Sequence, residues 1–258
     1  MILLAIPFGV LIGLVVGTVG GGGAILALPV LVYVLDEGVS PASTAALIVV
    51  ALGASVAAGA QARRGQLCWR IALMFSAPAA AGAYLGTLGN AEVSGRTLIL
   101  AFVPVMLAAA VLTYFRGDDR EDAAGGTCPS PALLPTASAG IGVGALTGFF
   151  GVGGGFLIVP ALTMLLGLPM RRAIATSLAI ITMTGLAALA SHLVAGSDPN
   201  WPLTLVLSGS AAVGGLAGSA LGRRLDTRAL AHAFGIVVGA VAVFLLVDVL
   251  ILGGPPTG

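Results

Sequence analysis

The sequence predicts an all-α polytopic membrane protein made of two inverted-topology repeats, each with one glycine-broken hairpin and three transmembrane helices. Three observations support this fold class. Of the 258 residues, 58% are hydrophobic and only 8% are charged, which is far from the composition of a water-soluble domain. Long uncharged runs recur along the chain. The second half also repeats the glycine, proline and tryptophan pattern of the first half.

Six uncharged runs have the length of ordinary membrane spans. A helix needs about 20 apolar residues to cross roughly 30 Å of hydrocarbon, because each unsatisfied backbone group in lipid costs several kcal/mol. The runs that meet this requirement are 42–62, 71–91, 97–115, 173–197, 199–222 and 229–247. We therefore expect each of them to cross the membrane once.

Two further uncharged runs, 2–35 and 133–169, are too long for a single crossing. Each would extend about 50 Å as an unbroken helix at about 1.5 Å per residue. Both contain a glycine cluster followed by a proline, and glycine adopts backbone angles that are closed to other residues. We expect each run to break at its glycines and to fold back as a hairpin.

The two halves of the chain are copies of one unit. Small residues and a proline of the first half recur with the same spacing in the second, Gly20, Gly22, Gly23 and Pro29 matching Gly151, Gly153, Gly154 and Pro160. One inserted residue later the match continues, Trp69, Arg96 and Phe102 matching Trp201, Arg228 and Phe234. The prediction is a first repeat at 1–115 and a second at 133–258. A cytoplasmic linker at 116–132, rich in acids, glycine and proline, joins them.

The arginines decide the orientation, because the chain has eleven basic residues and none is lysine. Basic residues concentrate in cytoplasmic loops. If each long run crossed once, the two faces would carry nearly equal numbers of arginines. If each run returns to the face it entered, only Arg96 lies outside and all the others are cytoplasmic. We therefore predict a multi-pass protein of the cell inner (cytoplasmic) membrane with both termini outside.

The glycine clusters predict an anion-binding site near the membrane midplane. Glycines leave backbone N–H groups uncovered, and the N-terminus of a helix carries partial positive charge. Both properties favour oxyanions, most strongly where water is scarce. Two tips that meet from opposite faces would surround one anion without a buried arginine. The predicted substrate-binding residues are Gly20, Gly21, Gly22, Gly23 and Ala24 in the first tip and Gly151, Gly153, Gly154 and Gly155 in the second.

The remaining glycines are interpreted as positions where helices pack closely. Small residues at every fourth position let two helix backbones approach each other. This spacing occurs at Gly9, Gly13 and Gly17, at Gly82 and Gly86, at Gly140, Gly144 and Gly148, and at Gly214, Gly218 and Gly222. Close packing also stays open as the alternative role of the two clusters.

Three hydroxyl residues near the start of spans, Thr44, Thr176 and Ser177, are further candidates for binding the anion. Their alternatives are to cap a helix or to bond back to the preceding turn. Gln61 and His192 occupy matching positions in the two repeats. In the inverted topology they lie near opposite faces, where they would take part in gating or coupling. His192 is the candidate for proton coupling, with an interfacial anchor as the alternative.

The matched glycine segments, written GxxGGGG…P and GxxGVGGG…P, resemble those of the TauE/SafE family of sulfite and organosulfonate exporters, also called the sulfonate uptake permease family. Each is followed by a span that opens with Thr or Ser, and the stretch from Arg172 to Ser177 and the GxxxW-type starts of two later spans add to the resemblance. It covers nearly the whole chain. It implies transport of small sulfur-containing anions, such as sulfite, sulfoacetate or other organosulfonates.

Other classes of function fit the sequence less well. A net charge of +1 lacks the basic surface that nucleic-acid binding needs. Cys68 and Cys128 cannot build a disulfide framework, and no spacing of ligands predicts a metal or another cofactor. There is no GxxxxGK[ST] motif, so ATP cannot drive transport directly.

An intramembrane hydrolase is disfavoured because no GxSxG motif occurs and His192 and His232 lie near opposite faces. The sequence therefore predicts a transporter and not an enzyme. Its partners are a small anionic substrate and the lipid bilayer. A passive anion channel stays the alternative, and assembly as a homodimer stays open.

Overall fold

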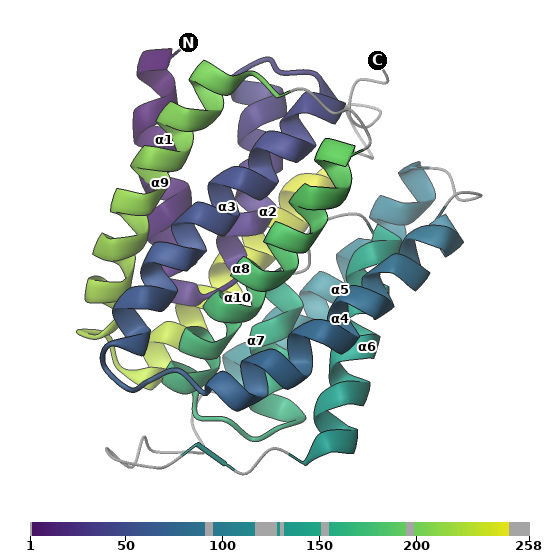
Figure 1. Ribbon diagram of the computed structural model, residues 1–258, viewed down its shortest axis with the longest axis vertical. Helices are drawn as coiled ribbons and strands as arrows, with labels where there is room; N and C mark the ends of the chain where they lie inside the picture. The colour runs from purple at the N-terminus through teal and green to yellow at the C-terminus, as the bar shows by residue number, and fades with distance from the viewer. Residues whose placement is uncertain are drawn as a thin grey trace.

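The computed structural model describes residues 2–90, 95–116, 128–129, 132–150, 155–194 and 199–247. Throughout these residues the regular structure is helical (Figure 1). In chain order the elements are α1 (Ile2–Val19), α2 (Gly22–Pro29), the π-helical turn η1 (Val30–Val34), α3 (Val39–Ala62), α4 (Trp69–Asn90), α5 (Gly95–Arg116), α6 (Leu133–Phe150), α7 (Gly155–Met164), α8 (Met170–Val194), α9 (Trp201–Gly222) and α10 (Thr227–Val247).

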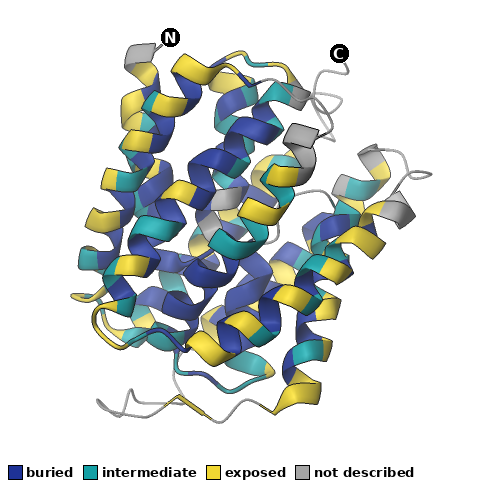
Figure 2. Ribbon diagram, in the orientation of Figure 1, coloured by how far each residue is buried: buried dark blue, intermediate teal, exposed yellow. Residues whose placement is uncertain are grey.

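The all-α prediction is confirmed, and each of the six ordinary runs forms one helix, namely α3, α4, α5, α8, α9 and α10. Within the described residues, 5 helices are long and apolar enough to cross a membrane: α3, α6, α8, α9 and α10. Large apolar side chains such as Leu205 and Val213 stay exposed on the outer surface, while buried side chains face the centre of the bundle (Figure 2). Lipid tails solvate such an outer surface.

The first overlong run breaks at the predicted glycines. Helix α1 ends at Val19, and Gly20 has a φ of +83°, a conformation that favours glycine because it has no Cβ. Gly21 then forms the N-cap of α2, and the chain reverses direction between α1 and α2 (Figure 1). The second run is divided in the same region, between Phe150 and Gly155; Gly151, Gly153 and Gly154 lie outside the described residues.

The returning arm of each broken run ends in the same kind of turn. After α2 and η1, Asp36 has a φ of 55°, and the Glu37 N–H donates to the Leu31 carbonyl at 3.0 Å. After α7, Gly167 has a φ of +66°, and the Leu168 N–H donates to the Leu162 carbonyl at 3.0 Å. The two arms are therefore closed by equivalent hydrogen bonds.

Glycine stripes let the helix backbones touch. Helix α1 packs along α9, and α4 packs along α6. A Cβ atom on Gly13 would overlap the Ala211 carbonyl, and one on Gly144 would overlap the Ala79 carbonyl. The packing role predicted for these stripes is thus confirmed for α1 and α6, whose glycines face the partner backbone.

The ends of the bundle differ in charge. The loops that follow α3, α7 and α9 lie at one end, opposite the start of α1 (Figure 1). These loops and the first turns of the next helices carry most of the arginines, including Arg63, Arg64, Arg70, Arg171, Arg172, Arg223, Arg224 and Arg228. We call this end the arginine-rich end.

Candidate functional site

Gly21 of the first glycine cluster meets Gly155 of the second inside the bundle. A Cβ on Gly21 would overlap the carbonyl oxygen of Gly155, and a Cβ on Gly155 would lie 3.2 Å from the carbonyl oxygen of Gly21. Both glycines are buried. The structure thus brings together residues far apart in sequence that the glycine pattern had assigned to one site.

Two helices begin at this contact. Gly22 and Ala24 form the first turn of α2, whose N-cap Gly21 supplies no side-chain hydrogen bond. Gly23 is buried in the same turn, and α7 begins at Gly155. The first N–H groups of a helix have no partner within that helix, so two sets of donors and two positive dipole ends start at neighbouring points.

Helix α8 supports the first tip. The Ser177 hydroxyl lies 3.0 Å from the Gly20 carbonyl oxygen and 2.8 Å from the Ile174 carbonyl oxygen, so it can donate either to the tip or back to its own helix. A Cβ on Gly20 would lie 2.7 Å from the Ser177 Oγ and 3.0 Å from the Ile174 Cα. The tip therefore rests against one turn of α8.

The other two hydroxyl candidates are also buried. Thr176 is 0% exposed, and its Oγ1 accepts a hydrogen bond from the Cys68 N–H at 3.3 Å. Thr44 is 0% exposed on α3. Thr176 thus contacts the loop before α4, whereas its neighbour Ser177 contacts the glycine tip.

The two gating candidates lie toward opposite ends of the bundle. Gln61 is buried near the end of α3, at the arginine-rich end. His192 lies in the last turn of α8, which begins at the arginine-rich end and runs away from it (Figure 1). Gln61 also lines a pocket with Gly17 and Thr18 of α1.

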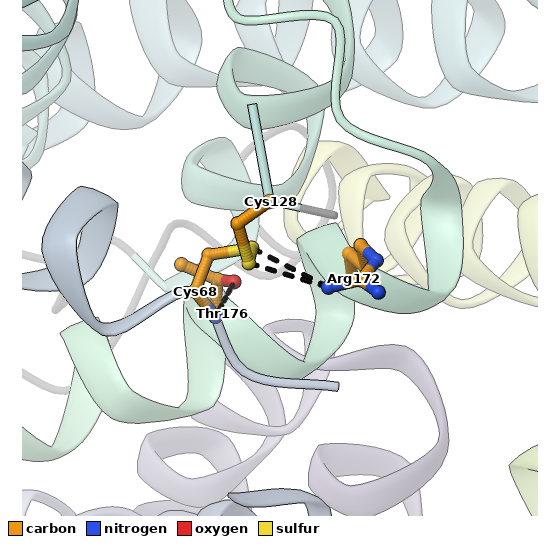
Figure 3. Close-up of a disulfide and its surroundings, with 4 residues drawn as sticks. All are labelled: Cys68, Cys128, Arg172 and Thr176. Atoms are coloured by element: carbon orange, nitrogen blue, oxygen red, sulfur yellow. Dashed lines mark hydrogen bonds between the residues drawn. A yellow bond between two sulfur atoms is a disulfide. The ribbon is translucent and has the colours of Figure 1, made fainter. Parts of the chain in front are cut away.

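A disulfide between Cys68 and Cys128 joins the loop before α4 to the segment that precedes α6 (Figure 3). The Arg172 guanidinium lies beside it, with Nη1 3.2 Å from the Cys128 sulfur. Thr176 is one turn further along α8. Sequence reasoning missed this bond, because two cysteines separated by 60 residues carry no signal that they meet.

Arg171 holds the turn between α9 and α10. Its Nη2 donates to the Leu225 carbonyl at 2.7 Å and its Nη1 to the Arg223 carbonyl at 3.3 Å. A cation at the C-terminal end of a helix is favourable because the helix dipole is negative there. Arg171 therefore fixes the backbone that follows α9.

A helical bundle with an apolar outer surface and two interrupted runs that meet in its interior defines a multi-pass membrane protein of the transporter class. Residues 5–245 match the family described as Sulfite exporter TauE/SafE, and the chain belongs to this family. The resemblance seen in the glycine segments is thus confirmed. The family is one of transporters, and the protein is a membrane transporter and not an enzyme.

Relatives with the name "Probable membrane transporter protein" occur in distant organisms. One from Xylella fastidiosa (strain Temecula1) is 34% identical over 257 residues, which are 95% of each chain. YunE of Bacillus subtilis is 30% identical over 89% of this chain and 93% of its own. One from Methanocaldococcus jannaschii is 23% identical over 95% of this chain and 96% of its own. No solved structure is significantly similar to the chain.

Proposed function

We propose that this protein is a secondary transporter of small sulfur-containing anions, such as sulfite, sulfoacetate or other organosulfonates, across the cytoplasmic membrane. The anion binds near the midplane at the two glycine-rich tips. The contact between Gly21 and Gly155 carries this proposal, because it gathers the N-termini of α2 and α7 at one buried place. Helix N-termini bind oxyanions through backbone donors and dipole charge.

The proposed architecture is a pair of inverted repeats, 1–115 and 133–258. Its support is the exchange of helix partners: α1 packs on α9, and the equivalent helix α6 packs on α4. The equivalent pairs α3 with α8, α5 with α10 and α2 with α7 also contact each other. A two-fold axis that exchanges the halves requires this pattern.

The proposed orientation places the arginine-rich end in the cytoplasm and both termini outside. The linker 116–132 then lies in the cytoplasm, and Cys128 next to Arg172 supports its position at that end. Alternating access would expose the tips to each face in turn. A passive channel would lack saturable counterflow, and this measurement separates the two mechanisms.

Sulfite flux into proteoliposomes tests the site. Gly21→Ala should reduce flux at least tenfold, because its new methyl group overlaps the Gly155 carbonyl and forces the two tips apart. Gly142→Ala on α6 is the matched control, because a Cβ there meets nothing within 4 Å. Unchanged flux in a folded Gly21→Ala protein would refute the proposed site.

A further inference from the structure

A polar pocket lies beside the first glycine tip, at the arginine-rich end. Its polar lining consists of Thr18, Gln61, Arg64, Gln66, Arg171 and Arg223. Its empty volume is about 370 Å³, including the part that opens to solvent. The cavity itself has a volume of about 40 Å³, which is enough for a small ion or a few water molecules.

The pocket and the glycine tip share a wall. Ile174 lines the pocket, and its Cα lies 3.0 Å from where a Cβ on Gly20 would be. Gly17 and Thr18, in the last turn of α1, lead directly to Gly20. An ion in the pocket would therefore be one helix turn from the tip at which the proposed transport site lies.

Three arginines line this pocket, and they come from three different parts of the chain. Arg64 follows α3, Arg171 lies in the first turn of α8 and Arg223 follows α9. None of the described lining residues is acidic. Such a lining attracts anions, and guanidinium groups match the paired oxygens of sulfite or a sulfonate.

The backbone around these arginines is organised. The Gln61 carbonyl accepts hydrogen bonds from the N–H groups of Arg64 and Gln66, both at 3.2 Å, and Gly65 has a φ of +68°. Arg171 bonds to the carbonyl of Arg223 at 3.3 Å. The loops that present Arg64 and Arg223 are thus held in place, which lowers the entropy cost of binding an ion.

Orientation of the spans alone does not explain this convergence. The positive-inside rule requires arginines in the loops, but it does not require three of them to line one cavity. Arg63 and Arg224 are adjacent in sequence to Arg64 and Arg223, and all four are exposed, yet only Arg64 and Arg223 are part of the lining. The chain therefore offers its own comparison between exposed arginines that line the pocket and exposed arginines outside it.

We propose that this pocket is a separate binding site for a small oxyanion of sulfur, from which the ion passes to the glycine tips. The inference rests on the proposed function, since it describes how the transported anion is collected at one end. Arg64, Arg171 and Arg223 supply charge, and the Gln61 and Gln66 side-chain amides supply further N–H donors. The tips then receive an ion that has already lost part of its water shell.

The test compares two double variants that lose the same charge from the same loops. Arg64→Gln with Arg223→Gln changes the pocket lining, and Arg63→Gln with Arg224→Gln changes only the surface. In proteoliposomes the pocket variant should raise the KM for sulfite about tenfold, as loss of charge-assisted hydrogen bonds does, with kcat within about twofold of wild type. The surface variant should keep its KM within about twofold, since neither of its arginines lines the pocket.

A second readout measures binding without transport. Sulfite should raise the Tm of the purified wild type and of the surface variant more than that of the pocket variant, which keeps only the site at the glycine tips, because stabilisation follows affinity for the folded state. Arg64→Lys with Arg223→Lys keeps the charge and loses the forked geometry. Its KM should lie between those of wild type and the pocket variant. If the Gln double variant does not fold, the Lys double variant is compared with wild type in its place.

The outcomes separate the pocket from the proposed function. Equal KM and equal Tm shifts in the two double variants would overturn the pocket while sulfite transport stands. If wild type moves no sulfite but is stabilised by it through Arg64 and Arg223, the pocket stands and the transport proposal fails. If sulfite neither moves nor stabilises wild type, both are overturned. A Tm shift by sulfate as large as that by sulfite would extend the ligand class to other oxyanions.

Discussion

At Ser177 one hydroxyl connects a membrane helix to the glycine tip. Its Oγ lies 3.0 Å from the Gly20 carbonyl, and the residue is 0% exposed. A second acceptor, the Ile174 carbonyl, is within 2.8 Å. The hydroxyl can therefore change between two acceptors by rotation about one bond, and the tip can separate from α8 without leaving a buried donor unpaired.

Replacing this hydroxyl should weaken the tip without disrupting the helix. Ser177→Ala is expected to lower the free energy of unfolding by about 1 kcal/mol, the usual contribution of one hydrogen bond, and to reduce sulfite flux severalfold. Tm and flux of the purified protein give the two values. Ser138→Ala is the control, because Ser138 is exposed and bonds only within its own helix turn, to the Pro135 carbonyl at 3.2 Å. Equal losses in both variants would contradict a role for Ser177 at the tip.

The contacts of Gly21 and Thr176 show which parts of the site can be predicted from the sequence and which cannot. The glycine pattern predicted that Gly21 and Gly155 share a site, since duplication and excess length are both visible in the sequence. The direction of the Thr176 hydroxyl toward Cys68 was not predictable, because the rotation of α8 is fixed by packing against other helices. The role of the hydroxyls, and of Gln61 and His192, stays a prediction.

Among the elements, the paired helices depend on glycines that face a partner backbone. Helix α6 offers a comparison within one turn, because Gly144 faces the Ala79 carbonyl while nothing lies within 4 Å of a Cβ on Gly142. Without a hydrophobic driving force between helices in lipid, such close approach is the main source of their attraction. A glycine within the stripe and a glycine outside it therefore have different roles on two faces of one helix.

A methyl group added at Gly144 or at Gly142 should affect the stability of the protein differently. Gly144→Ala is expected to destabilise the α4–α6 pair by about 1–3 kcal/mol, the usual cost of overpacking, whereas Gly142→Ala should be neutral or slightly stabilising since alanine favours helix. Thermal unfolding of the two purified variants in the same detergent would measure the difference. A Gly144→Ala protein as stable as wild type would mean that the helices do not pack as described.

The ends of the helices were largely predictable from the sequence. Which residues of different helices and loops come together was not. The break after Val19 follows from a run too long for one span, and each ordinary run forms a helix. The arginines were visible in the sequence as orientation signals. Their meeting at one pocket, with Arg64 and Arg223 coming from two loops and Arg171 from the first turn of α8, depends on helix pairs that no spacing reveals.

At the scale of the whole molecule, the start of α1 lies at the end opposite the arginine-rich loops (Figure 1). A protein fluorescent only in the cytoplasm, fused after the last residue, should therefore stay dark in intact cells, because both termini are predicted outside. The same reporter inserted in the linker 116–132 should be bright. A bright carboxy-terminal fusion with a dark linker insertion would reverse the orientation.

The proposed orientation determines whether the disulfide between Cys68 and Cys128 lies on a reducing or an oxidising side of the membrane. In the cytoplasm glutathione and thioredoxin keep thiols reduced, so on that face Cys68 and Cys128 would be separate thiols in an unstressed cell. Oxidative stress would form the bond and tie the residue Cys128, before α6, to the loop before α4, next to Arg172. On the opposite, oxidising face the disulfide would stay formed. Whether Cys68 and Cys128 are oxidised or reduced in living cells therefore also shows on which side of the membrane they lie.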